Sequence, residues 1–148
     1  VGLMLAKPNK FPLFGRQLLR VFAPFTFKST GGLSRLSAAL RYSWKGLKAA
    51  LRYEAAFRQE LAVAAILIPC AFFLGRTAPE VILLCGVVFL VLIVELLNSA
   101  VEAVADAISL DNHPLLGRAK DLGSAAVFLS VGFAIAIWLT FILLRFVF

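Results

Sequence analysis

The sequence is poor in the residues that build disulfide frameworks and metal–thiolate sites. It has two cysteines, one histidine and one methionine among 148 residues. Cys70 and Cys85 each lie within an apolar run, so we expect both to be small core residues. No internal repeat is evident. The composition therefore indicates neither a disulfide framework nor a metal site built on cysteine.

Acids are also scarce, because the chain has eight of them against fifteen lysines and arginines. Residues 1–32 contain no acid, and Pro8, Pro12 and Pro24 interrupt any long helix there. No short apolar core followed by a small-residue cleavage site is evident, so we do not predict a signal peptide. We expect residues 1–32 to form a basic leader that is disordered or adheres to the membrane.

Long apolar runs dominate the rest of the chain. Hydrophobic residues make up 61% of the sequence and the mean hydropathy is +0.94, whereas an ordinary soluble domain is roughly 45–50% apolar. The length suits one domain. We therefore expect a membrane domain at 33–148, with spans at about 58–75, 80–108 and 116–146. The first apolar run is short, so its span must include part of the preceding EAAFRQE.

A basic amphipathic helix is predicted ahead of the spans, at about 34–56. Its apolar residues recur at helical spacing: Leu36, Leu40, Trp44, Leu47 and Leu51. Its basic residues follow the same period one position later: Arg41, Lys45, Lys48 and Arg52. Such a helix is typical of a membrane surface, and the alternative is a solvated helix that packs on a soluble core. The predicted fold is all-α, a polytopic membrane protein with one surface helix and three transmembrane helices.

The distribution of basic residues predicts the orientation in the membrane. The net charge is +7, and eleven of the fifteen lysines and arginines precede Ala62. Because basic residues near spans stay in the cytoplasm, we expect a cytoplasmic N-terminus, an outside turn at Arg76 and an inside turn at Arg118 and Lys120. The charge could also indicate nucleic-acid binding. Its place beside membrane spans favours anionic lipid headgroups instead.

The second span carries polar residues where apolar ones are expected. At about 100° per residue they share one helix face: Glu95, Asn98, Ser99, Glu102 and Asp106. Glu95 follows Glu80 by fifteen residues, or about 22 Å of helix. In a hydrocarbon core about 30 Å thick, Glu95 should lie some 8 Å inside the cytoplasmic boundary. An acid at that depth is a functional candidate by default; the alternative is a structural contact between helices or subunits.

Carboxylates near a basic interface suit a hard cation that is bound together with phosphate, because Mg²⁺ prefers one or two carboxylates plus phosphate oxygens. Glu54 could reach Glu102 at the cytoplasmic boundary, and the alternative is a salt bridge to Arg58. The stretch GRAKDLGS could hold an anion at a helix N-terminus, although the spacing of a P-loop is missing. His113 is predicted to be a loop residue and not a catalyst.

Four stretches together resemble the bacterial integral-membrane diacylglycerol kinase family: YSWKGLKAA, YEAAFRQE, VELLNSAVEAVAD and GRAKDLGSAAV. The resemblance covers about Leu33 to Phe148 and leaves the leader outside. It implies a homotrimer in the bacterial inner membrane. It also implies Mg²⁺- and ATP-dependent phosphorylation of diacylglycerol to phosphatidic acid, a step of lipid recycling and phospholipid metabolism.

The resemblance also assigns roles to residues. Glu95 matches the general base for the lipid hydroxyl, and Asn98 a polar residue beside it; Glu54 and Glu102 match the metal-binding glutamates. The positions that match nucleotide contacts are Arg35, Tyr42, Glu54, Glu102, Asp111, Asn112, His113, Lys120 and Asp121. Those that match lipid contacts are Arg35, Ala39, Leu40, Arg41, Tyr42, Ser43, Trp44, Lys48, Ala49, Ala50, Leu51, Ala56, Phe57, Arg58, Gln59, Glu60, Glu95 and Ser124.

Three other functions remain as alternatives. The first is undecaprenol kinase, a relative that acts on a longer lipid alcohol; GRAKDLGSAAV favours the diacylglycerol enzymes. The second is a small proton or cation carrier, since acids inside a membrane also mark ion paths. A carrier would explain Glu95 but not the basic surface helix. The third is a structural subunit without chemistry.

Overall fold

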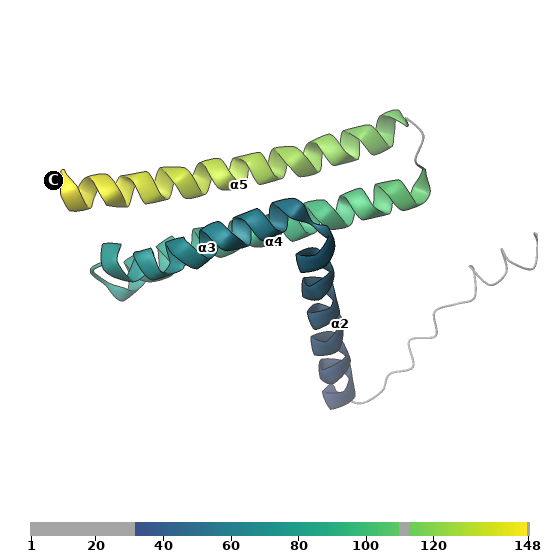
Figure 1. Ribbon diagram of the computed structural model, residues 1–148, viewed down its shortest axis with the longest axis horizontal. Coiled ribbons are helices and arrows are strands. Elements are labelled where there is room, and N and C mark those ends of the chain that lie inside the picture. The colour runs from purple at the N-terminus through teal and green to yellow at the C-terminus, as the bar shows by residue number, and fades with distance from the viewer. Residues whose placement is uncertain (1–31, 110–112, 148) are drawn as a thin grey trace, which may run out of the picture. The chain divides into compact units, whose positions relative to one another are not determined.

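The computed structural model describes residues 32–109 and 113–147. Within these residues the chain forms four α-helices and no strand (Figure 1): α2 (Gly32–Tyr53), α3 (Ala55–Leu74), α4 (Ala78–Ile108) and α5 (Pro114–Phe146). The all-α prediction is confirmed. The helix ends differ from the expected ranges by no more than three residues. Residues 1–31 of the predicted leader lie outside the described residues, as do Asp111 and Asn112, whereas Gly32 begins α2.

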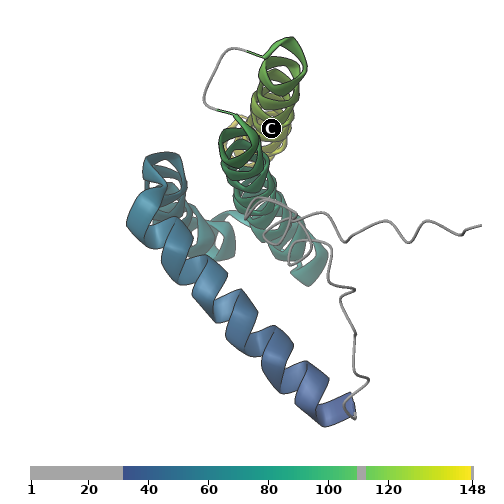
Figure 2. The same cartoon turned by 90° about the vertical axis from the view of Figure 1, so that its right-hand side faces the viewer.

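The described residues fall into two units, with the boundary between Ala38 and Ala39, inside α2. In the second unit, α4 packs against α3 on one side and along α5 on the other, whereas α3 and α5 make few contacts. Figures 1 and 2 show α5 running back alongside α4 after the α4–α5 turn. The second span is therefore the central helix of this unit, so its polar face can be covered by its neighbours.

The turn between α3 and α4 is short and tightly packed. Pro79 stands in the first turn of α4, where its missing N–H costs nothing. The Glu80 carboxylate accepts a hydrogen bond from the backbone N–H of Arg76 at 2.6 Å. A Cβ on Gly75 would lie 2.7 Å from Cγ2 of Val81. Glycine at this position lets the chain reverse closely against the start of α4.

The core of the second unit joins small residues of α3 to branched residues of α4 and to one tryptophan. Ala64 and Ala71 of α3 are fully buried, as is Leu84 of α4. Small residues let transmembrane helices approach closely. The indole Nε1 of Trp138 on α5 donates a hydrogen bond to the carbonyl oxygen of Leu84 at 3.3 Å. The three spans therefore meet in one core cluster.

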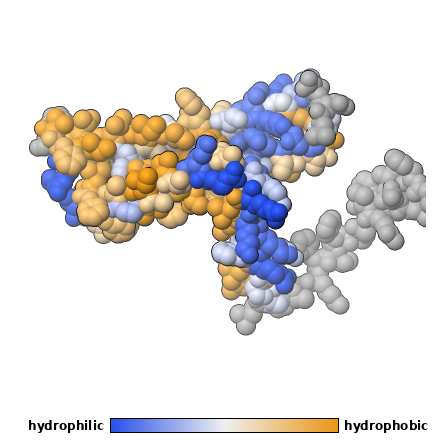
Figure 3. Space-filling view, in the orientation of Figure 1, coloured by the Kyte–Doolittle hydropathy of each residue, from blue (hydrophilic) through white to orange (hydrophobic). Residues whose placement is uncertain are grey.

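Three helices are long and apolar enough to cross a membrane: α3, α4 and α5, with 20, 31 and 33 residues. Many of their large hydrophobic side chains are exposed, among them Phe73 and Phe128. On the face shown in Figure 3, hydrophobic residues cover most of these helices, and hydrophilic residues gather near the α4–α5 turn. Such an apolar surface needs lipid or a protein partner. The prediction of three spans is confirmed.

The prediction that both cysteines lie in the core is wrong for Cys70. Both cysteines are free thiols, as expected, but Cys70 is exposed and Cys85 is half-buried. Cys70 directly precedes the buried Ala71 on α3. Successive helix positions differ by about 100°, so Cys70 is turned away from the face of α3 on which Ala64, Ala71 and Leu74 lie.

The apolar face of α2 is not covered by a core. Leu40 and Trp44 remain more than half exposed, and the same holds for Tyr42 and Tyr53. Basic side chains lie over three of its aromatic rings, with Lys48 Nζ 5.5 Å from the centroid of the Trp44 ring. The alternative of a helix packed on a soluble core is therefore not observed for the described residues of α2.

Candidate active site

The polar face of α4 points inward. Glu95 is 4% exposed, and Asn98 and Glu102 are half-buried. On the other side of the helix, Leu97 and Val104 are about three-fifths exposed. The helical period predicted one polar face, and the packing of α4 between α3 and α5 decides that this face is the interior one.

Glu95 is the centre of a group of carboxylates. It lies within electrostatic range of Glu102, two turns further along the same face of α4, and of Glu54, at the α2–α3 junction. Glu60 on α3 is in turn within electrostatic range of Glu95. Glu54 and Glu102, the pair that the resemblance assigns to metal binding, are therefore both within electrostatic range of Glu95.

Glu54 occupies the N-cap position of α3, and its side chain makes no capping hydrogen bond there. The alternative that Glu54 pairs with Arg58 is wrong. The Arg58 guanidinium instead donates to the carbonyl oxygens of Leu51 and Arg52, both at 3.4 Å. These carbonyls belong to the last turn of α2, where a cation is favourable. The carboxylate of Glu54 is therefore not neutralised by Arg58.

Asn98 lies between the buried Glu95 and the half-buried Glu102 on the polar face of α4. Its amide Nδ2 donates a hydrogen bond to Oε1 of Glu102 at 3.0 Å. Within the described residues, the buried Oδ1 of Asn98 has no hydrogen-bond partner, and neither has the buried Oε2 of Glu60. A buried acceptor without a donor is costly. Two such atoms beside Glu95 are typical of a site that receives a polar ligand.

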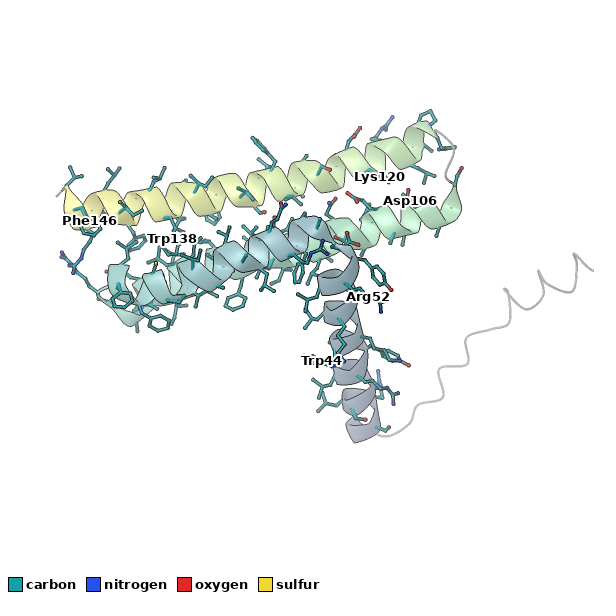
Figure 4. All side chains as sticks on the ribbon, in the orientation of Figure 1. Trp44, Arg52, Asp106, Lys120, Trp138 and Phe146 are labelled. Carbon is teal, nitrogen blue, oxygen red and sulfur yellow. The ribbon has the colours of Figure 1, made fainter. Side chains whose placement is uncertain are left out.

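Lys120 of α5 lies at the end of this group that is nearer the α4–α5 turn. Its Nζ forms an ion pair with Oδ1 of Asp106 at 2.6 Å, and Figure 4 shows the two side chains pointing toward one another between α4 and α5. Lys120 is also within electrostatic range of Glu102. A cation that phosphate can contact therefore stands beside the carboxylates.

The remaining predicted nucleotide contacts are less closely gathered. The imidazole Nδ1 of His113 accepts a hydrogen bond from the backbone N–H of Leu115 at 3.3 Å, so His113 caps α5. Asp121 is exposed on α5, and Arg35 is exposed on α2. Tyr42 lies under the Arg41 guanidinium, 5.7 Å from the ring centroid. Among the described residues, no hydrogen bond or ion pair joins Tyr42 to the carboxylates.

The predicted lipid contacts fall into two groups. Those on α2 are exposed or half-exposed except for Ala50, and Ser124 on α5 is also exposed. On α3, Phe57 is buried and Glu60 is half-buried, whereas Ala56 and Gln59 are exposed. On α3, Phe57 and Glu60 therefore reach the interior, whereas the α2 positions other than Ala50 face the surroundings.

The sequence analysis missed an apolar groove between α3, α4 and α5. Its volume is about 490 Å³, and its walls include Leu67 of α3, Leu92 of α4 and Trp138 of α5. Gln59 and Glu60 are its polar lining residues, both near the start of α3. The walls come from three segments far apart in the sequence, so helical periodicity alone could not predict them.

The carboxylates suit a magnesium ion that arrives with a nucleotide. Among the described residues, no group of three or more histidine, cysteine, aspartate or glutamate side chains is arranged to hold a metal. Mg²⁺ typically takes one or two carboxylates and completes its shell with water and phosphate oxygens. The Glu54 carboxylate makes no capping hydrogen bond, and the hydrogen bond from Asn98 engages only Oε1 of Glu102. The donor set therefore fits Mg²⁺ with phosphate.

Comparisons with known proteins agree on one family. The family model described as prokaryotic diacylglycerol kinase matches residues 41–142. A diacylglycerol kinase of Haemophilus influenzae is 50% identical over 109 residues, which cover 74% of this chain and 92% of that protein. One of Pseudomonas aeruginosa is 47% identical over 121 residues, covering 82% and 98%. One of Escherichia coli is 48% identical over 110 residues, covering 74% and 90%.

Proposed function

The chain belongs to the prokaryotic diacylglycerol kinase family, and from this premise we propose that it transfers the γ-phosphoryl group of ATP to the free hydroxyl of diacylglycerol, forming phosphatidic acid and ADP. The observation that carries the proposal is the position of Glu95. It is buried inside a membrane-spanning helix and lies within electrostatic range of Glu54, Glu60 and Glu102. A membrane-bound hydroxyl and a water-soluble nucleotide can meet only at such a boundary.

Glu95 acts as the general base in this proposal. The lipid hydroxyl oxygen forms a bond to the γ-phosphorus while the bond from that phosphorus to the leaving ADP oxygen breaks. The hydroxyl proton passes to the Glu95 carboxylate. Phosphoryl transfer has a loose transition state, so the base mainly orients the hydroxyl and takes its proton late.

Glu54 and Glu102 are the residues that would hold Mg²⁺. When bound, the ion would neutralise charge on the β- and γ-phosphates. Lys120 adds a side-chain cation beside Glu102, and lysine binds phosphate as a point charge. These three residues would hold the γ-phosphate over Glu95. The metal ion and Lys120 would offset the repulsion between the negative phosphates and the carboxylates.

The apolar groove supplies a place for the lipid chain. Its polar lining residues, Gln59 and Glu60, are near the start of α3, and Glu60 is within electrostatic range of Glu95. An acyl chain along Leu67 and Trp138 would pack against apolar side chains and leave the glycerol hydroxyl at the carboxylate end. This arrangement favours a membrane lipid over a soluble alcohol.

We propose the bacterial inner membrane as the location, with the N-terminus in the cytoplasm. Positive charge on α2 and near the α4–α5 turn supports this orientation, since both ends would face the cytoplasm. The unburied apolar face of α2 would rest in the interface. We also propose a homotrimer, in which part of the exposed apolar surface of the spans is covered by neighbouring subunits.

The deciding experiment offers diacylglycerol and undecaprenol side by side with labelled ATP in mixed micelles. We expect label in phosphatidic acid, and its loss in the Glu95→Gln variant. Label only in undecaprenyl phosphate would make the chain an undecaprenol kinase. If neither lipid is labelled but reconstituted protein moves ions, the proposal is overturned in favour of a carrier.

A further inference from the structure

α5 approaches α4 closely opposite Asn98. The residue that faces Asn98 is Gly123, and a Cβ built on Gly123 would collide with the Asn98 amide oxygen Oδ1. The same Cβ would lie 3.3 Å from Cγ and 3.8 Å from Cα of Asn98. The Asn98 amide therefore occupies the space that any other side chain at position 123 would need.

This contact differs from those of the other glycines in the same helices. A Cβ on Gly86 of α4, or on Gly117 or Gly132 of α5, would meet nothing within 4 Å. Glycine is unfavourable in a helix interior by roughly 1 kcal/mol relative to alanine, so a helical glycine calls for a packing reason. Within α4 and α5, only Gly123 has one in the part of the chain that the structure describes.

The Asn98 amide is held from one side only. Nδ2 donates to Oε1 of Glu102 at 3.0 Å, whereas the buried Oδ1 has no hydrogen-bond partner within the described residues. No donor therefore fixes the oxygen end of the amide, and its orientation depends on the space above Gly123. A methyl group there would push the amide aside, because the end of a side chain yields more readily than two packed helices. The bond to Glu102 would then be lost or bent.

We propose, on the basis of the proposed function, that Gly123 is a positioning residue for the metal–nucleotide site. It leaves room for the Asn98 amide, the amide holds Oε1 of Glu102, and the remaining oxygen of Glu102 is thereby presented to Mg²⁺ and the phosphates. Gly123 contacts no substrate in this arrangement. Its effect reaches the ligand through two side chains of α4.

The test compares Gly123→Ala with Gly132→Ala, which makes the same change on the same helix in open space. The first readout is the concentration of Mg²⁺ with a non-hydrolysable ATP analogue that gives half of the maximal thermal stabilisation in micelles. We expect this concentration to rise about tenfold in Gly123→Ala, since loss of an outer-shell partner typically weakens metal binding by about 10–100-fold. It should stay near the wild-type value in Gly132→Ala.

The second readout separates positioning from a general packing defect. In Gly123→Ala the KM for ATP should rise about tenfold at fixed Mg²⁺, whereas the KM for diacylglycerol and the unliganded melting temperature should change little. Equal losses for both substrates, or a wild-type response to the analogue, would overturn the proposal. In that case wild-type phosphorylation of diacylglycerol would still support the proposed function.

A double-mutant cycle covers the possibility that Gly123→Ala simply fails to fold. Asn98→Ala removes the atom that the new methyl group would meet. The double variant Asn98→Ala/Gly123→Ala should therefore fold, and it should bind the analogue no more weakly than Asn98→Ala alone. If Gly123→Ala costs the same with and without the Asn98 side chain, the glycine acts by another route and the proposal is wrong. If wild-type protein neither binds the analogue nor phosphorylates diacylglycerol, the proposed function itself fails.

Discussion

The ammonium group of Lys120 lies 2.6 Å from the carboxylate of Asp106, and this ion pair joins α5 to α4 beside the α4–α5 turn. Both side chains are more than a third exposed, so solvent screens the pair and its contribution to stability is small. Its consequence is geometric. Asp106 holds the end of Lys120 within electrostatic range of Glu102.

Replacement of Lys120 by methionine should therefore affect the nucleotide. We expect Lys120→Met to raise the KM for ATP about tenfold, because a charge-assisted contact to phosphate is lost. The KM for diacylglycerol should change less than about threefold, because the lost contact is to the phosphate of the nucleotide and not to the lipid. Steady-state kinetics in mixed micelles measure both constants. Asp106→Asn is the matched comparison and should cause a smaller rise, since the cation itself remains. An equal rise in the KM for ATP in both variants would show that the intact ion pair is what is needed, and not a direct contact of Lys120 with phosphate.

Glu95 is the subject of a second prediction. Glu95→Gln keeps the size and hydrogen-bonding capacity of the side chain but cannot accept the hydroxyl proton. We expect kcat to fall about 10²–10⁴-fold, the usual contribution of a general base, while thermal stability stays near that of the wild type. Glu80→Gln makes the same chemical change at the other end of α4, where the carboxylate accepts a hydrogen bond from the backbone N–H of Arg76. It should leave kcat unaltered. Near-normal turnover in Glu95→Gln would remove this residue as the base.

The polar face of α4 was predictable because it depends on one helix alone. The positions of Glu95, Asn98 and Glu102 follow from 3.6 residues per turn, and the lengths of the apolar runs predicted three spans. The charge pattern also predicted the surface helix. Each of these features is local, so no knowledge of the neighbouring helices was needed.

Contacts between helices were not predictable in the same way. The bond from Trp138 to Leu84 joins residues 54 positions apart, and the collision between a Cβ at Gly123 and Asn98 depends on how two helices are rotated. Neither leaves a periodic signal. The failure of the Glu54–Arg58 alternative has a similar cause, because the end of α2 offers Arg58 carbonyl oxygens that spacing along one helix does not reveal.

Glu102 provides a third prediction, on metal dependence. Glu102→Gln should raise the Mg²⁺ concentration required for half-maximal activity by about tenfold or more, because a neutral amide is a weaker ligand for a hard cation than a carboxylate. The measurement is a titration of activity with Mg²⁺ at saturating ATP. Glu54→Gln should shift the same curve in the same direction. A metal dependence identical to that of the wild type in both variants would exclude these residues as ligands.

The groove gives the fourth prediction, on the lipid chain. Ile135 of α5 lines the groove and is 54% exposed, so a larger side chain there fills the groove without overpacking the core. Ile135→Trp should raise the KM for long-chain diacylglycerol at least about threefold, because only the long chain extends past this position and a steric clash in a packed site costs roughly 1–3 kcal/mol. The KM for a short-chain analogue should rise less. Phe133→Trp adds bulk at a residue that is 50% exposed on the same helix and outside the groove lining. It should leave the ratio of the two KM values unchanged. Equal effects of both variants on both lipids would place the acyl chain elsewhere on the surface of the spans.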